Sequence, residues 1–286
     1  MPQDDSLAPT PAQHGHDEAA RPKIRARAVV LIALILLILV IMVGARVMFL
    51  SPSPSSPATA GPALETRIGE VRQIALADGS QLILDTDTRI ITAFTRKQRW
   101  IEVQQGRVRI VVGRDKIRPF LVRVGAREIV TTGAMFDVRH REGAGTGIHM
   151  IQGSIEIHNA DPPEDGAGRE KIILPSGENL LFPAAPDAAP VRSRALPSDG
   201  QWVDEIQGFK DVPAGDIIAQ ANAYGTDAIE LADPAMASER ITGQINIRSP
   251  AAAAEAIAAH LGLAVDHSRP GRIIIIGNPT RPDRQD

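Results

Sequence analysis

The chain has 286 residues, a formal net charge of −3 and no cysteine. The absence of cysteine excludes disulfide bonds, cysteine-ligated metal sites and a cysteine nucleophile. One tyrosine, two tryptophans and six phenylalanines supply little aromatic surface for stacking on bases, so we expect no direct nucleic-acid partner.

An uncharged apolar run occupies residues 28–45 and extends to residue 50 after the single Arg46. Eighteen helical residues rise about 27 Å, close to the thickness of a bilayer core. The run therefore predicts one transmembrane helix over residues 28–50. A cleaved signal peptide is the alternative, because Ala58-Thr59-Ala60 resembles a cleavage site, but the run is longer than the apolar region of a signal peptide.

Positive charge is concentrated on the amino-terminal side of this run. The positive-inside rule therefore places residues 1–27 in the cytoplasm and everything after residue 50 outside. Residues 1–27 lack apolar periodicity and are predicted to be a disordered tail, and the Pro/Ser-rich residues 51–62 are predicted to be a linker. The topogenic charges are Arg21, Lys23, Arg25 and Arg27.

The next segment has the pattern of β structure. Short alternating stretches are separated by glycines, and Asp78-Gly79 favours a tight hairpin turn. We predict an all-β domain over residues 63–183, either sandwich-like or β-helical, and we favour the β-helical stack. The predicted strands are residues 67–76, 81–84, 89–94, 99–103, 107–112, 120–124, 128–131, 135–139, 147–151, 154–158 and 171–174.

A second linker is predicted over residues 184–200, and a mixed pattern follows it. Strands are predicted at residues 208–212, 228–231, 240–248, 263–267 and 272–276. Helices are predicted at residues 213–223, capped by Asp211, and 251–261, with Ser249 as N-cap and Pro250 in the first turn. The order β-α-β-β-α-β-β predicts a small two-layer α/β domain over residues 201–280.

Three stretches of the β segment resemble the periplasmic part of FecR-type regulators. They are GEVRQIALADGSQLIL (69–84), RPFLVRVGAREIVTTGAMFDVR (118–139), in which Ala134 replaces the usual threonine, and MIQGSIEIH (150–158). The carboxyl-terminal segment is similar to the STN-like module that closes these regulators. Its landmarks are Gln201-Trp202, residues 209–213, Asn222-Ala223-Tyr224 and Ile241-Thr242-Gly243.

The resemblance implies a sensor in the cytoplasmic (inner) membrane with its bulk in the periplasm. Members of this family regulate extracytoplasmic-function sigma factors through protein–protein contacts. The implied partners are the signalling domain of a TonB-dependent transporter, or another envelope protein, outside and a sigma factor inside. A membrane-tethered periplasmic binding or scaffolding module without sigma control is the alternative hypothesis, because only 27 residues precede the apolar run.

No enzyme motif is present, so we expect no catalytic residue, no cofactor and no metal site. His140, His149 and His158 recur every nine residues and could approach one another, although surface histidines are the simpler interpretation. Asp85 and Asp87 are interpreted as turn-capping residues rather than a catalytic pair. The group at Arg96, Lys97 and Arg99 is interpreted as a solvated strand end, with docking of an acidic partner as the alternative.

The predicted strand at residues 240–248 offers a binding hypothesis. An unpaired edge of this strand could accept a partner strand through main-chain hydrogen bonds. A proline at Ile245 should then weaken capture of the partner. The residues predicted to mark this edge are Arg240, Gln244, Asn246 and Arg248.

Overall fold

The computed structural model describes residue 61 and residues 63–95, 98–160, 171–185 and 188–277. The chain divides into two compact units, residues 1–56 and 57–286, and the description below concerns the second. The predicted tail, the predicted span at 28–50 and the four topogenic charges lie outside the described residues. Within the described residues, no helix is long and apolar enough to cross a membrane.

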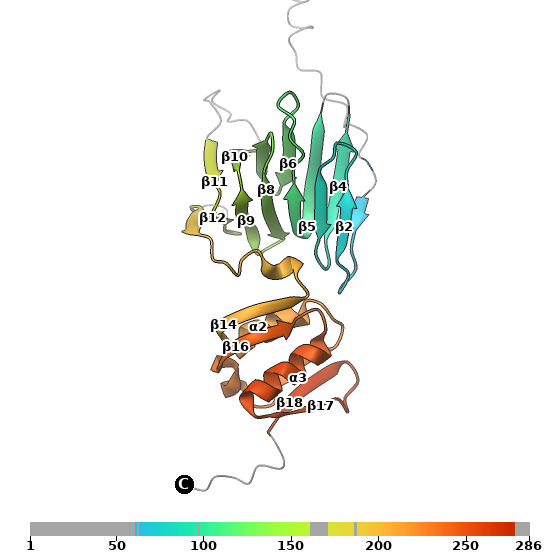
Figure 1. Cartoon of the computed structure of the whole chain (residues 1–286), viewed down its shortest axis with the longest axis vertical. Coiled ribbons are helices and arrows are strands. Elements are labelled where there is room, and N and C mark those ends of the chain that lie inside the picture. Colours follow the sequence, from blue (N-terminus) through green and yellow to red (C-terminus); the bar gives the residue numbers. More distant parts are fainter. Residues whose placement is uncertain (1–60, 62, 96–97, 161–170, 186–187, 278–286) are drawn as a thin grey trace, which may run out of the picture. The chain divides into compact units, whose positions relative to one another are not determined.

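The first part of the second unit is a β domain whose strands pair into two layers (Figure 1). Its strands are β1 (Ala63–Glu65), β2 (Arg72–Ala75), β3 (Gln81–Leu84), β4 (Arg89–Phe94), β5 (Arg99–Val111), β6 (Phe120–Val124), β7 (Arg127–Thr131), β8 (Met135–Arg141), β9 (Gly145–Gln152), β10 (Ser154–Asn159), β11 (Lys171–Pro175), β12 (Glu178–Phe182) and β13 (Val191–Arg194).

Strand β5 belongs to both layers. Its first half pairs with β4 and β6, and its second half pairs with β3 and β8. The bend lies at Gly106, where φ is +95° and a Cβ atom would lie 2.5 Å from the Cα of Thr88. Only glycine fits such a bend. The strands predicted at 99–103 and 107–112 are therefore joined through Gly106 into one bent strand, β5.

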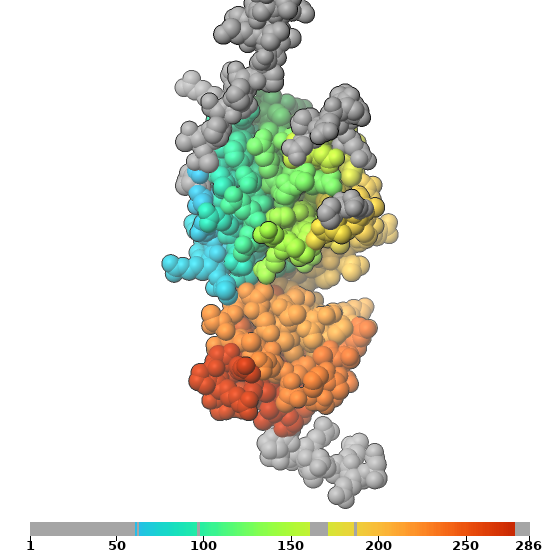
Figure 2. Space-filling view, turned by 180° about the vertical axis from the view of Figure 1, so that it is seen from behind, coloured from blue at the N-terminus to red at the C-terminus, as the bar shows by residue number. Residues whose placement is uncertain are grey.

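One layer has the order β1-β4-β5-β6-β7-β10-β11, and the other has the order β2-β3-β5-β8-β9-β12-β13. Figure 2 shows the earliest strands at one side of the domain in blue and cyan and the latest at the other in yellow. Every described pair in this domain is antiparallel except β5–β6. A parallel β-helix needs parallel pairs throughout, so the arrangement is sandwich-like rather than the favoured β-helical stack.

The inward-facing residues of both layers form one core. Phe120, Phe136, Leu82, Ile101 and their neighbours are fully buried there. Such burial is the main favourable term in folding. The β12–β13 pair was not predicted, and β13 lies inside the segment predicted to be a linker, residues 184–200.

The remaining residues form an α/β domain with its own core. Its elements are η1 (Gln201–Val203), β14 (Ile206–Pro213), α2 (Ala214–Asn222), β15 (Ala228–Leu231), η2 (Pro234–Ser238), β16 (Arg240–Asn246), α3 (Pro250–Leu261), β17 (Ala264–Asp266) and β18 (Arg272–Ile276). β14 pairs with β16, and β15, β18 and β17 form a three-stranded sheet (Figure 1).

The caps predicted from the sequence are present at the ends of α3 but not at the start of α2. The hydroxyl of Ser249 accepts from the amide of Ala252, and Gly262 ends α3 in the left-handed conformation, as the sequence indicates. The prediction that Asp211 caps α2 is wrong, because the N-cap is Pro213. Asp211 instead has φ +56° within a bulge of β14.

Candidate functional site

A buried carboxylate joins the β domain to the α/β domain. Asp85, 2% exposed, follows β3, and its Oδ1 accepts a 2.8 Å hydrogen bond from the hydroxyl of Tyr224, just after α2. Its Oδ2 accepts a 2.7 Å hydrogen bond from Nε of Arg107 on β5. Asp85 is therefore not the turn-capping residue that its LDTDTR context predicts.

Tyr224 is held in place by its surroundings as well as by this bond. Burial, together with the charge of Asp85, raises the pKa of its hydroxyl far above the usual value. Nη2 of Arg107 also donates to the Tyr224 hydroxyl, at 3.2 Å. The phenol therefore remains a neutral donor at every physiological pH.

A second buried carboxylate makes a parallel connection. Nε and Nη2 of Arg109 donate to the two oxygens of Asp137 at 2.7 and 2.8 Å. The indole N–H of Trp202, in η1, donates to Asp137 Oδ2 at 2.7 Å, and Arg109 also donates to the carbonyl of Gly200 at 2.7 Å. Both charged groups are thus paired and hydrogen-bonded, as burial requires.

The indole of Trp202 links the two connections. The guanidinium carbons of Arg107 and Arg109 lie 4.6 and 5.6 Å from the centre of its ring, within range of cation–π attraction. We call Asp85, Arg107, Arg109, Asp137, Trp202 and Tyr224 the junction network. It contains the single tyrosine and one of the two tryptophans of the chain.

A close backbone contact accompanies the junction network. The amide of Gly69 donates to Oγ1 of Thr86, which donates to the carbonyl of Ala223 at 3.0 Å. Gly69 has φ +80°, and a Cβ atom there would lie 2.6 Å from the carbonyl oxygen of Tyr224. No other residue type fits this position without moving the turn after α2.

A groove of about 820 Å³ lies beside the junction network, with Trp202 and Asp137 among its lining residues. The β domain contributes side chains of β8, β9, β12 and β13, and the α/β domain contributes β14. Its rim exposes the aliphatic side chains of Leu181, Val191 and Leu196. Large exposed aliphatic groups that line one groove are typical of a protein-binding surface.

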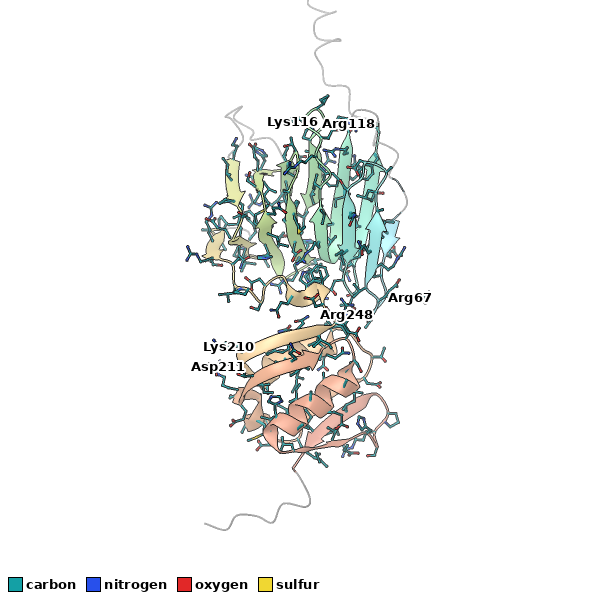
Figure 3. All side chains as sticks on the ribbon, viewed as in Figure 1. Arg67, Lys116, Arg118, Lys210, Asp211 and Arg248 are labelled. Atoms are coloured by element: carbon teal, nitrogen blue, oxygen red, sulfur yellow. The ribbon has the colours of Figure 1, made fainter. Side chains whose placement is uncertain are left out.

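The groove is also lined by charged side chains, among them Arg139, Lys210 and Asp199. Arg139 and Lys210 are exposed, and neither forms an ion pair with another described residue. Gln207 is 5% exposed, and its amide nitrogen has no hydrogen-bond partner among the described residues. Figure 3 shows Lys210 beside Asp211, and both lie at the bulge within β14. Strands β13 and β14, which both line the groove, are terminal strands of their sheets and can add a further strand.

Three of the residues predicted to mark a partner-binding edge, Arg240, Gln244 and Asn246, lie on β16, the partner of β14, and Arg248 follows that strand. Three of them contact other parts of the chain: Arg240 donates to the carbonyl of Asp211, Asn246 to Glu205 and Arg248 to the carbonyl of Val203. Gln244 is exposed. The binding role of this edge stays a prediction.

The three histidines each have a separate neighbour. His140 bonds Thr146, His149 bonds Asn179, and His158 lies 3.7 Å from Glu156. Within the described residues, no group of three or more histidine, aspartate or glutamate side chains could hold a metal ion. Arg99 is not a solvated strand end, because it is 1% exposed and pairs with Asp78 at 2.9 Å.

The comparisons with known proteins match the part of the chain that carries the two carboxylates. The family model described as "FecR protein" matches residues 63–156, a range that includes Asp85, Arg107, Arg109 and Asp137. Residues 63–156 are a FecR domain. Trp202 and Tyr224, the other members of the junction network, come from outside the FecR domain.

The fold is also that of solved structures. Two crystal structures of a "putative anti-sigma factor" from Parabacteroides distasonis ATCC 8503 match with TM-scores of 0.56 and 0.57, at 22% identity. Each match covers 76% of this chain and 99% of the other. This share is larger than the FecR domain, so the shared architecture extends into the α/β domain. None of the curated proteins compared with this chain matches it.

Sequence reasoning missed the junction network and the groove. Trp202 and Tyr224 stand in the predicted landmarks Gln201-Trp202 and Asn222-Ala223-Tyr224, but their contacts were not predicted. The available signal was the rarity of aromatic residues in a chain that places two of them at these landmarks.

Proposed function

We propose that the protein is a membrane-anchored periplasmic signal sensor that regulates an extracytoplasmic-function sigma factor through protein–protein contacts. The observation that carries the proposal is the FecR domain joined to an α/β domain by the buried junction network. A partner that binds the α/β domain would perturb buried ion pairs of the FecR domain. The similarity to the fold of the Parabacteroides distasonis protein, which is described as a "putative anti-sigma factor", supports the same proposal.

The α/β domain is, in this proposal, an STN-like module, and its partner is the signalling domain of a TonB-dependent transporter or another envelope protein. The groove supports it, since it is lined by exposed aliphatic groups and by Arg139 and Lys210, two cations without an ion pair among the described residues. Strand addition at the edge of β14 or β13 would supply main-chain hydrogen bonds. The proposal contains no catalytic step.

The proposed location is the cytoplasmic membrane, with a single span at 28–50, the amino terminus in the cytoplasm and the bulk in the periplasm. The basic residues before the apolar run support this orientation. Because the chain has no cysteine, single cysteines report topology cleanly.

The topology test labels Ser6→Cys and Ser193→Cys proteins in cells with a permeabilised outer membrane, using a membrane-impermeant maleimide. We expect labelling at position 193 before lysis and at position 6 only after lysis. Labelling of both positions only after lysis would overturn the periplasmic location.

The regulatory test uses the full chain. We expect it to co-purify with an extracytoplasmic-function sigma factor of the same cell, and a promoter reporter of that sigma factor to respond to the chain. Retained membrane location without sigma binding or a reporter response would contradict sigma control and favour the scaffolding alternative.

The partner test reverses charge in the groove. Arg139→Glu and Lys210→Glu should each weaken binding of an isolated transporter signalling domain by about tenfold, because each removes a cation and adds an anion at the contact. Arg269→Glu, an exposed cation outside the groove, is the matched control and should leave affinity unchanged. Equal effects of all three substitutions would exclude the groove as the contact.

A further inference from the structure

The connection between β5 and β6 presents an exposed aliphatic side chain among cations. Ile117 is 91% exposed, the highest value among the large exposed hydrophobic residues described. Lys116 and Arg114 on its amino-terminal side are exposed, and Arg118 follows it. An isoleucine that remains almost fully in water contributes nothing to the core, so its position needs another explanation.

Hydrogen bonds to the side chain of Asp115 hold the conformation of this loop. One oxygen of Asp115 accepts hydrogen bonds from the amides of Ile117 and Arg118 at 2.9 and 3.1 Å, and the other accepts from Nε of Arg118 at 2.9 Å. The two backbone bonds hold the pKa of Asp115 at about 2, below its usual value. The carboxylate therefore keeps the loop closed at neutral pH and directs Ile117 outward.

The base of the loop is fixed by a buried cation. Nε of Arg99 donates to the carbonyl of Arg118 at 3.0 Å, and its Nη1 donates to the carbonyl of Gly113 at 3.1 Å. Both ends of the loop are thus attached to the start of β5. Because the loop is already ordered, binding through Ile117 at its tip costs little conformational entropy.

The loop lies at the end of the β domain nearest to where the chain enters it. The amide of Gly61 bonds the carbonyl of Thr92 at 2.7 Å, near the end of β4, and the β4–β5 turn leads directly to Arg99. Figure 3 shows Lys116 and Arg118 at one end of the domain and Arg67 at the opposite end. Residues 51–60, between the predicted span and Gly61, can reach at most about 35 Å.

We propose that the β5–β6 loop docks on the anionic lipid surface of the membrane, with Ile117 among the headgroups and Arg114 and Lys116 against their phosphates. This inference rests on the proposed membrane anchor. One aliphatic side chain and two cations bind lipid weakly by themselves. The tether makes contact effectively intramolecular, so a weak site suffices to orient the FecR domain against the bilayer.

The test places a fluorophore on the loop of the full chain in lipid nanodiscs. The dye is attached to Pro119→Cys, next to a native Ile117, and Ile68→Cys, 57% exposed beside Arg67, is the control. In discs with phosphatidylglycerol and brominated acyl chains, we expect quenching of at least twofold at 119 and none at 68. Phosphatidylcholine discs should reduce quenching at 119.

Two further variants separate the contribution of the isoleucine from that of the cations. Adding Ile117→Asp should abolish quenching while leaving the loop folded, because Asp115 binds the backbone of residue 117 and not its side chain. Adding Arg114→Glu with Lys116→Glu should abolish the dependence on anionic lipid. Incorporation into discs without quenching at 119 overturns this inference alone, whereas failure to incorporate overturns the anchor and the inference with it.

Discussion

The hydroxyl of Tyr224 donates a 2.8 Å hydrogen bond to the carboxylate of Asp85, which lies 139 residues earlier in the chain. The bond connects the turn after α2 with the β3–β4 connection of the FecR domain. Because Arg107 and Trp202 complete the surroundings of this contact, movement of the α/β domain must change the environment of a buried charge. This gives the proposed sensor a physical route between its two domains.

Removal of the tyrosine hydroxyl tests that route. Tyr224→Phe leaves the Asp85–Arg107 pair but removes one bond to a buried carboxylate, so we expect a loss of about 1.5–3 kcal/mol in the free energy of unfolding. Urea titration of the full chain measures it. A double-mutant cycle with Asp85→Asn should show coupling above about 1 kcal/mol, and additive losses would show that the two groups do not interact.

Substitution of Gly69 tests the close contact between this residue and the backbone of Tyr224. Gly69→Ala places a Cβ atom 2.6 Å from the carbonyl oxygen of Tyr224 at φ +80°. Gly79→Ala is a matched control, because φ is +83° there and nothing lies within 4 Å of the added atom. We expect Gly69→Ala to lower the melting temperature more than Gly79→Ala does. Equal shifts would mean that only backbone strain is measured.

The second carboxylate allows a graded test. Arg109→Lys cannot reproduce the two bonds to Asp137 together with the bond to the carbonyl of Gly200, so we expect a loss of about 3 kcal/mol or more. Trp202→Phe keeps an aromatic ring but loses the N–H donor, so we expect a loss of about 1.5–3 kcal/mol. Chemical denaturation measures both. A larger loss for Trp202→Phe than for Arg109→Lys would contradict the assigned roles.

His140 makes stability depend on pH. Burial lowers the pKa of His140 below its usual 6.5, while Glu142 partly opposes this shift. The unfolded chain then binds the proton at higher pH than the folded chain, so stability is complete above about pH 7.5 and falls as pH drops through 6.5. We expect the urea midpoint to fall less between pH 7.5 and 5.5 in His140→Gln than in the wild-type protein. An equal decrease in both proteins would exclude His140 as a source of the pH dependence of stability.

Local patterns predicted many element ends correctly. The strands at residues 89–94, 120–124, 228–231 and 272–276 have their predicted limits, because alternation and turn residues act over a few positions. Gly106 was misleading, since a glycine that looks like a turn is a bend within β5. The β12–β13 pair was missed because β13 lies in a Pro/Ala/Ser-rich segment and is held by pairing with β12.

By itself, the sequence determined the two-domain β then α/β order, the Ser249 cap and the resemblance to FecR proteins. These depend on periodicity, capping and short motifs, which are local. Only the tertiary structure decided that Asp85 binds Tyr224 and Arg107, that Asp137 binds Arg109 and Trp202, and that Arg99 is buried beneath the β5–β6 loop. A charged side chain in a turn-like sequence is ordinarily solvated. It becomes a structural connector only when folding brings a distant donor to it and removes the water.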